Sequence, residues 1–167
     1  MDHLEYSQID DYIYIGTTIC CKEHLQELIR LGINTDIDLQ DEKEDKPAGV
    51  QAFLWLPTID FNAPSQAQLT IGADFLQDAV RHKMKCYVHC NAGEGRAPTL
   101  VAAYYILEGL TPTEALEKIK AKRPIIRPNR HQRAALKILY NHIKKIIKRH
   151  ELQKNAQRFR LPFYRPV

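Results

Sequence analysis

A cysteine and an arginine six positions apart carry the clearest chemistry in this sequence. Cys90 and Arg96 bracket a short loop that contains two glycines. The apolar run 86–88 before the loop is typical of a strand, and the longer apolar run 99–107 after it is typical of a helix. At the start of a helix the backbone N–H groups are unpaired and the helix dipole favours an anion. We therefore expect this loop to hold a thiolate and a phosphate together.

The residue types in the loop suit that chemistry. A thiol at a helix N-terminus beside a cation ionises readily, so Cys90 needs no dedicated base. The planar fork of Arg96 can bind two phosphoryl oxygens at once, which a lysine cannot do. Gly93 and Gly95 let the backbone turn its amides inward. The alternative is that Cys90 is a small buried hydrophobe and Arg96 a surface charge. The coincidence of nucleophile, glycines, arginine and strand–helix setting disfavours it.

The loop resembles the signature of the cysteine-dependent protein tyrosine and dual-specificity phosphatases, of the small single-domain atypical type. The resemblance covers about residues 8–145. It implies phosphomonoester hydrolysis through a phosphocysteine intermediate, without a metal or other cofactor, and a phosphorylated molecule as partner. It also implies that His89 supports the loop by hydrogen bonds to its backbone. The implied phosphate-binding residues are Asn91, Ala92, Gly93, Glu94, Gly95 and Arg96.

A leaving alkoxide or phenoxide needs a proton, so a general acid should accompany the nucleophile. The resemblance implies an aspartate upstream of the cysteine, and Asp60 is the candidate because it follows the buried-strand pattern 52–56. The ends of parallel strands share one edge of a sheet, so Asp60 should lie beside the Cys90 loop. The alternative is that Asp60 only caps a turn. Four other aspartates lack this setting: Asp36, Asp38, Asp74 and Asp78.

The segment 122–129 contains two prolines and resembles a late loop of the same family. In that family an asparagine after proline often supports the phosphate-binding loop, which makes Asn129 a candidate support residue. Arg127 is open to two interpretations: it reaches the substrate, or it serves as a surface or ion-pair residue.

Two residues depart from the family pattern. Ala97 follows the arginine where serine or threonine is usual, and the missing hydroxyl should slow departure of the cysteine thiolate. Glu94 would repel a polyanionic head group. We expect a dual-specificity phosphatase acting on phosphotyrosine and phosphoserine or phosphothreonine proteins. The alternatives are a lipid phosphate or a phosphoglucan as substrate, or a non-catalytic phosphate-binding module, which would not need Cys90 and Asp60.

The 167 residues have ordinary globular composition, with 44% hydrophobic and 26% charged residues. Strand and helix patterns alternate, which predicts a single α/β domain. Its mostly parallel sheet of four to five strands should be flanked by helices, with the phosphate-binding loop between a strand and a helix. We divide the chain into a catalytic domain, 1–150, and a basic C-terminal tail, 151–167. Strands are expected at 12–15, 33–39, 52–56 and 85–88, and helices at 22–31, 66–82, 99–107 and from 112.

The four cysteines lack the spacing of a disulfide framework, which favours a reducing compartment and predicts a cytoplasmic protein. The first residues lack the pattern of a signal peptide, and no apolar run is long enough to span a membrane. Cys20 and Cys21 are interpreted as packing residues at the start of an element. No cysteine and histidine spacing is convincing for zinc, so no metal site is expected.

The C-terminal segment is strongly basic. Residues 144–167 contain eight Lys or Arg and one acidic residue, Glu151, a formal charge of +7 that leaves −3 for the rest of the chain. Apolar residues between 138 and 147 have helical spacing. One interpretation is a terminal helix docked by that face. The other is a surface for an acidic partner, an anionic membrane or nucleic acid. The last ten residues are expected to dock or to fold back. Oligomeric state is not predicted.

Overall fold

The computed structural model describes residues 4–44 and 46–158. Five strands form one sheet in the order β1-β2-β5-β3-β4. Only the pairing of β1 with β2 is antiparallel, and the other three pairings are parallel. This confirms the predicted α/β fold with a mostly parallel sheet. The strands are β1 (Tyr6–Gln8), β2 (Ile13–Gly16), β3 (Ile33–Gln40), β4 (Ala52–Thr58) and β5 (Lys85–His89).

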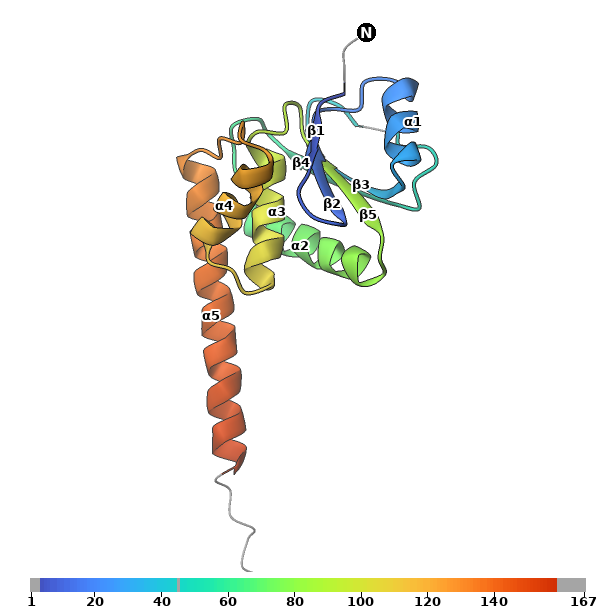
Figure 1. The fold of residues 1–167 in the computed structure, drawn as a ribbon. Helices are drawn as coiled ribbons and strands as arrows, with labels where there is room; N and C mark the ends of the chain where they lie inside the picture. Colours follow the sequence, from blue (N-terminus) through green and yellow to red (C-terminus); the bar gives the residue numbers. More distant parts are fainter. Residues whose placement is uncertain (1–3, 45, 159–167) are drawn as a thin grey trace, which may run out of the picture.

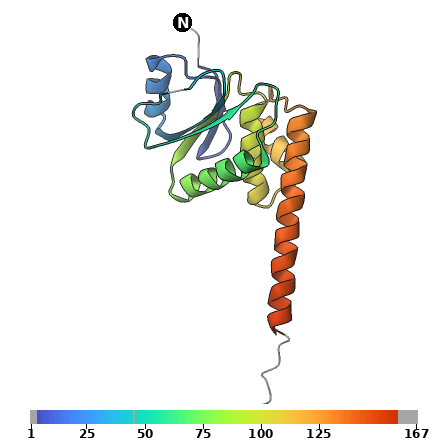
Figure 2. The ribbon, with the colours of Figure 1, turned by 180° about the vertical axis from the view of Figure 1, so that it is seen from behind.

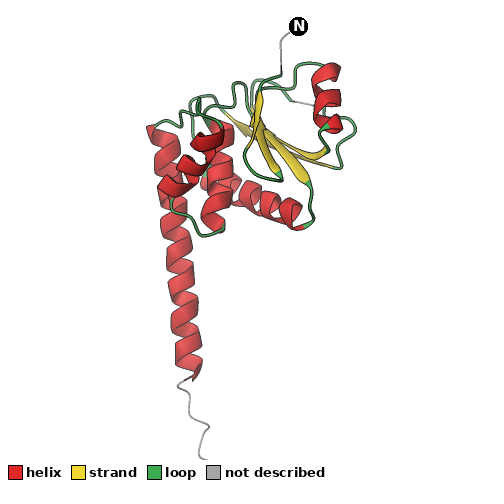
Figure 3. Ribbon diagram, viewed as in Figure 1, coloured by secondary structure: helices red, strands yellow, loops and turns green. Residues whose placement is uncertain are grey.

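Helices cover both faces of the sheet (Figures 1 and 2). One face carries α1, whose Leu28 packs with Tyr14 and Tyr87 of the sheet. The other face carries the remaining four helices and the larger apolar core, in which the buried helix α3 is central. The helices are α1 (Lys22–Arg30), α2 (Gln66–Arg81), α3 (Arg96–Leu107), α4 (Pro112–Lys122) and α5 (Arg130–Arg158). Figure 3 shows the strands of the sheet between α1 on one side and the other helices on the other.

Local sequence signals explain where two of these helices begin. Helix α4 begins at Pro112, as the sequence predicts, and Thr111 caps it in a capping box with Glu114. Ser65 and Gln68 form the same box at the start of α2. The short strand β1 was not predicted, because three mixed residues give no readable alternation.

The strand order decides which loops meet. The parallel strands β2, β5, β3 and β4 all end at one edge of the sheet. Because β3 lies between β5 and β4, the loop after β3 lies between the two loops that follow β5 and β4. Residues 41–44 are thereby placed between the Cys90 loop and the Asp60 loop.

Helix α5 is much longer than its packing against the body requires. It begins beside the loop edge of the sheet and runs past the opposite end of the domain (Figure 1). The helix continues without a break through residue 150. The division into a catalytic domain, 1–150, and a tail, 151–167, stays a prediction. Residues 159–167, including most of the expected docking tail, lie outside the described residues. Among the residues that the structure describes, no helix is long and apolar enough to cross a membrane.

Candidate active site

The phosphate-binding loop lies where the sequence predicts it, between the end of β5 and the start of α3. Gly93 has a φ of 64°, a conformation that glycine adopts without steric cost. A Cβ atom at Gly93 would lie 2.5 Å from the backbone oxygen of Gly16. The glycine is therefore required both by the turn and by the close approach of β2.

Cys90 is the first residue of this loop and is almost completely buried, with 3% of its surface exposed. It lines a cavity of about 350 Å³ together with Asp60 and Arg96. Cys86, which lies earlier in β5, is different in kind, since burial raises the pKa of its thiol to about 12. Cys86 is thus an unreactive thiol of the core, whereas the thiol of Cys90 faces a cavity.

The guanidinium of Arg96 is held from one side. Its Nη1 donates to the backbone oxygen of Thr58 at 2.8 Å, and both terminal nitrogens donate to the carboxylate of Glu42. Its Nε is buried and has no hydrogen-bond partner among the described residues. Burial acts to lower the pKa of Arg96, but Glu42 and the nearby Cys90 and Asp60 outweigh it and raise that pKa. The cationic guanidinium of Arg96 therefore lies at the cavity, and its Nε is a hydrogen-bond donor without a partner among the described residues.

The structure brings Asp60 to this site. Its Oδ1 lies 3.2 Å from Nη2 of Arg96, and its side chain is about half exposed at 48%. Oδ1 also accepts a hydrogen bond from the backbone of Phe61, which has a φ of 62°. Asp60 thus does form the turn contact of the alternative interpretation, while its carboxylate also reaches Arg96.

The comparison with known proteins decides the family. Residues 13–142 match the family described as "Dual specificity phosphatase, catalytic domain". This chain belongs to the dual specificity phosphatase family. The matched residues include the loop of Cys90 and Arg96, the loop of Asp60 and the first part of α5.

The curated relatives of this dual specificity phosphatase domain include two proteins whose names give a phosphatidylglycerophosphate phosphatase activity. The chain is 30% identical over 127 residues to phosphatidylglycerophosphate phosphatase PTPMT2 of Arabidopsis thaliana, covering 71% of this chain and 55% of that protein. It is 38% identical over 103 residues to phosphatidylglycerophosphatase and protein-tyrosine phosphatase 1 of Mus musculus, covering 60% and 53%. The chain thus spans about half the length of these relatives.

Solved structures show the same fold. A crystal structure of PTPMT1 in complex with PI(5)P matches with a TM-score of 0.76 and 27% identity, covering 85% of this chain and 98% of that chain. A mutant form of Tk-PTP matches with a TM-score of 0.74 and 30% identity, covering 83% and 96%. Human DUSP28 is 20% identical and supports the fold alone, with a TM-score of 0.74 over 83% of this chain and 95% of that chain.

In this dual specificity phosphatase domain, His89 is enclosed beneath the loop. Its Nε2 lies 3.3 Å from Oδ1 of Asp36, and its Nδ1 lies 3.8 Å from Oδ1 of Asp38. The ring also stacks on Tyr87 at 5.3 Å. In the sequence, Asp36 and Asp38 lack the setting expected of a site residue, because neither follows a strand end. The pairing of β3 with β5 nevertheless brings both carboxylates to the histidine.

Arg123 is a loop-supporting residue that sequence reasoning missed. It is 1% exposed, and its Nε and Nη2 donate to the backbone oxygens of Gly93 and Ala92 at 3.0 and 3.1 Å. These bonds fix the far side of the phosphate-binding loop. A basic residue before a proline is an ordinary feature of a helix C-terminus, so nothing in the local sequence pattern indicates that the side chain of Arg123 is buried.

Asn129 contacts the loop that carries Asp60. Its Nδ2 donates to the backbone oxygen of Phe61 at 2.6 Å, and its Oδ1 accepts from the backbone N–H of Gln132. Gln132 in turn donates to the backbone oxygen of Asn62. The described hydrogen bonds of Asn129 therefore reach the residue next to Asp60, whereas the expected support was of the phosphate-binding loop itself.

The two departures from the family pattern have definite surroundings. Ala97 is completely buried in the first turn of α3, and the hydroxyl of nearby Thr99 donates to the backbone oxygen of Gly95 at 2.7 Å. The carboxylate of Glu94 lies 3.5 Å from the guanidinium of Arg127, and the backbone N–H of Arg127 also donates to the backbone oxygen of Glu94. Arg127 forms an ion pair that offsets the charge of Glu94, and it also lines the cavity of Cys90, so the interpretation that it reaches the substrate stays a prediction.

Glu42 was not predicted as a site residue, because a run of charges between two strands has the composition of a solvated loop. Its contact with Arg96 lowers the pKa of its carboxyl to about 2, since the hydrogen bond from the arginine favours the ionised form.

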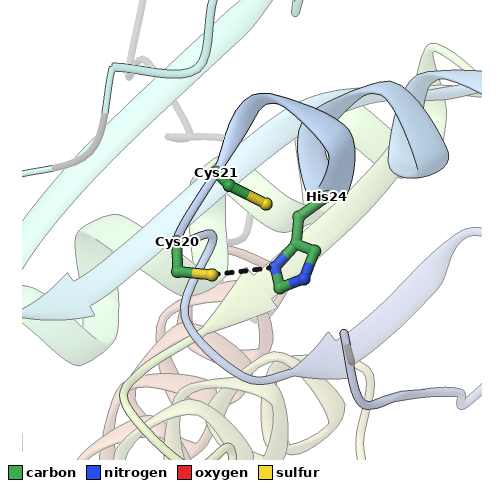
Figure 4. Close-up of side chains that lie close together, drawn as sticks. All are labelled: Cys20, Cys21 and His24. Carbon is green, nitrogen blue, oxygen red and sulfur yellow. Dashed lines mark hydrogen bonds between the residues drawn. The ribbon is translucent and has the colours of Figure 1, made fainter. Parts of the chain in front are cut away.

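A group of potential metal ligands, which the sequence did not predict, lies on the neighbouring loop, where Cys20, Cys21 and His24 come together (Figure 4). It is the one such group of potential metal ligands among residues 4–44 and 46–158.

Proposed function

We propose that this domain hydrolyses phosphomonoesters through a phosphocysteine intermediate. The observation that carries the proposal is the buried Nε of Arg96, a cationic donor with no partner among the described residues, at the cavity that Cys90 lines. An unsatisfied buried donor costs free energy unless a ligand pairs with it. A phosphate in this cavity supplies the missing acceptor.

The hydrogen bonds of Arg96 suggest how phosphate binds. Glu42 and the backbone of Thr58 hold one side of the guanidinium. Two oxygens of the substrate phosphate then accept hydrogen bonds from Nε and from Nη2, whose second hydrogen faces Asp60 in this structure. This exchange releases the Asp60 carboxyl to turn toward the leaving oxygen, so binding and acid catalysis are linked.

Two displacements complete the reaction. The Cys90 thiolate attacks phosphorus in line, an S–P bond forms, the P–O bond to the leaving group breaks, and Asp60 gives that oxygen its proton. Arg96 and the loop amides hold the equatorial oxygens, since phosphoryl transfer depends mainly on positioning and electrostatics. A water then attacks phosphorus, Asp60 takes its proton, the S–P bond breaks and inorganic phosphate leaves. Thiolate and carboxyl are both regenerated.

For the substrate, we favour phosphotyrosine and phosphoserine or phosphothreonine proteins. The cavity is small. The loop of Asp60 lies at its rim and presents Ile59 and Phe61, with 63% and 78% of their surfaces exposed. These side chains offer apolar contact to residues that flank a phosphorylated side chain. A lipid phosphate is the second candidate, because the relatives include phosphatidylglycerophosphatases and PTPMT1 has been crystallised with PI(5)P.

The basic part of α5 is assigned to an anionic surface or an acidic partner. Four exposed cations follow one another there over less than two turns: Lys144, Lys145, Lys148 and Arg149. They lie about 20–28 Å along the helix from its start beside the site. The helix runs away from the site edge (Figure 1), so this charge suits a tether and not a substrate pocket. The thiol chemistry of the site fits a reducing compartment such as the cytoplasm.

The test of the cysteine mechanism is Cys90→Ser assayed with p-nitrophenyl phosphate. Activity should fall to background while the melting temperature stays near that of the wild type. Wild-type activity should survive EDTA and be blocked by vanadate. Activity retained by Cys90→Ser, or lost from the wild type with EDTA, would overturn the mechanism.

The substrate class needs a separate assay of the wild type. Rates should be compared side by side for phosphopeptides, phosphoinositides, phosphatidylglycerophosphate and phosphoglucan. A kcat/KM highest for phosphopeptides supports the first candidate. A kcat/KM at least tenfold higher for either lipid class replaces it with the second.

A further inference from the structure

We propose that Cys20, Cys21 and His24 form a Zn²⁺ site with three protein ligands and one open position. The three side chains come from the loop after β2 and the first turn of α1 (Figure 4). The Sγ and ring nitrogen atoms that would bind the metal all lie within 4.8 Å of one another. None of these three residues lines the cavity of Cys90 and Arg96.

The distance between two of the ligand atoms matches tetrahedral zinc. Sγ of Cys20 lies 3.5 Å from Nδ1 of His24. With Zn–S of about 2.3 Å and Zn–N of about 2.0–2.1 Å, the edge between a sulfur and a nitrogen of a tetrahedron is about 3.6 Å. The ion can therefore enter between these two atoms with almost no movement of either residue.

Local structure explains why the three side chains converge. Cys21 is the N-cap of α1, with extended backbone, and His24 lies three residues later on the first turn. Residues at these two positions face each other across a helix start, as the partners of a capping box do. Cys20 and Cys21 are exposed, whereas His24 is 7% exposed and anchors the site.

The ligand types select the metal. Thiolate and imidazole are soft or borderline donors that suit zinc and are poor ligands for magnesium or calcium. Three protein ligands leave the fourth position to water, so we assign an exchangeable ion and not a closed structural centre. Both thiols lose their protons to solvent on binding, and His24 binds through a neutral ring.

The site adjoins a second cavity, of about 620 Å³, that Cys20 and Cys21 line together with residues of the loop after β3. In that loop Lys43 donates to the backbone oxygen of Ile19 at 2.9 Å. In the same segment, the backbone N–H of Thr18 donates to the backbone oxygen of Asn91 in the phosphate-binding loop. An ion at Cys20 and Cys21 would therefore order a segment that contacts both the loop of Glu42 and the loop of Cys90.

The test uses Cys90→Ser, because the active-site thiol could itself bind a metal. The protein is reduced with a phosphine and titrated with Co²⁺, a spectroscopic substitute for zinc. We expect one Co²⁺ per chain, with thiolate-to-cobalt charge-transfer absorption and the intense visible bands of four-coordinate cobalt. Zn²⁺ should displace it. Hydrogen exchange of residues 17–25 should slow when Zn²⁺ is bound.

Three further variants in the same background test the ligands. Cys20→Ser with Cys21→Ser should abolish the charge-transfer absorption, and His24→Asn should weaken binding at least tenfold. His24→Cys should keep four-coordinate cobalt and increase the charge-transfer absorption, a gain that damage to the fold cannot produce. His82→Asn, an exposed histidine at the end of α2, is the matched control and should bind as the parent does.

Two results would overturn the proposal. One is an unchanged cobalt spectrum and affinity when both cysteines are replaced. The other is the absence of charge-transfer absorption in fully reduced Cys90→Ser protein. Neither result depends on phosphatase activity, so the metal site and the proposed reaction stand or fall separately.

Discussion

Glu42 binds Arg96 through both carboxylate oxygens, at 2.8 and 2.9 Å, although the two residues are 54 positions apart in the chain. Arg96 is 1% exposed and Glu42 is 41% exposed, so the pair lies at the boundary between the core and the cavity. The carboxylate holds the two terminal nitrogens and leaves Nε for a ligand. Glu42 therefore acts as a positioning residue for the arginine that the proposed substrate contacts.

This pair makes stability depend on pH in a defined range. The pKa of Glu42 is lowered from 4.5 to about 2 in the folded protein. A lowered folded-state pKa gives stability that is present above pH 4.5 and is lost as the pH falls toward 2. Glu42→Gln should thus cost about 1 kcal/mol at pH 6, a value reduced for the partial exposure of Glu42, and much less near pH 2.5.

Urea unfolding of both proteins across this pH range measures the effect. Glu117→Gln, an exposed change on α4, is the control and should show no such convergence. Equal stability of Glu42→Gln and wild type at pH 6 would contradict the prediction.

Asp60→Ala should slow the reaction according to the leaving group. With a poor leaving group such as an alkyl phosphate, we expect about a 10²–10³-fold loss in kcat, because the proton must come from Asp60. An activated aryl phosphate needs that proton far less and should lose much less rate. The acidic-group limb of the pH–rate profile should also disappear.

The matched control is Asp74→Ala, which removes an exposed aspartate from α2. It should leave both rates unchanged. An equal loss of rate for both leaving groups in Asp60→Ala, with the acidic limb retained, would place the general acid at another residue.

Ala97→Ser should raise the steady-state rate. The side chain of Ala97 is buried beside the phosphate-binding loop, and the hydroxyl of Thr99 is already bonded to Gly95. No hydroxyl on the first turn of α3 is then free to ease departure of the Cys90 thiolate. In the wild type, hydrolysis of phosphocysteine should limit turnover.

Rapid-mixing kinetics test this point. The wild type should release a burst of leaving group near one equivalent of enzyme, and Ala97→Ser should reduce the burst while raising turnover. Linear product release from the first turnover, together with no gain from the serine, would show that the alanine has no kinetic consequence.

Arg123→Lys should loosen the phosphate-binding loop. A lysine cannot donate to both Ala92 and Gly93 in the geometry that the guanidinium provides, so one buried carbonyl loses its partner. The expected cost is about 1–3 kcal/mol of stability, with at least a tenfold fall in kcat/KM. Thermal melts and steady-state kinetics measure both quantities.

Arg81→Lys provides the matched control, since Arg81 is 64% exposed and pairs only with Asp78 among the described ion pairs. It should change stability by less than about 0.5 kcal/mol. Wild-type melting and wild-type kcat/KM in Arg123→Lys would refute a supporting role for Arg123.

The sequence by itself determined the parts of this protein that depend on neighbours along the chain. The loop between Cys90 and Arg96 is readable because a strand, two glycines and a helix follow one another within a few residues. The start of α4 at Pro112 could be predicted because the signals for a helix start lie within a few positions of one another. Asp60 could be placed at the correct sheet edge because parallel strands end on the same side.

The tertiary structure alone decided what lies across the sheet edge and under the loop. The strand order puts the loop after β3 between the loops of Cys90 and Asp60, and periodicity within a segment carries no information about that order. Glu42, Asp36 and Asp38 were missed for this reason. Arg123 was missed because its contact with the backbone of residues 92 and 93 depends on how the end of α4 packs against the phosphate-binding loop. Cys20, Cys21 and His24 were passed over for a related reason, because only the turn into α1 brings atoms that are merely near in sequence to ligand distance.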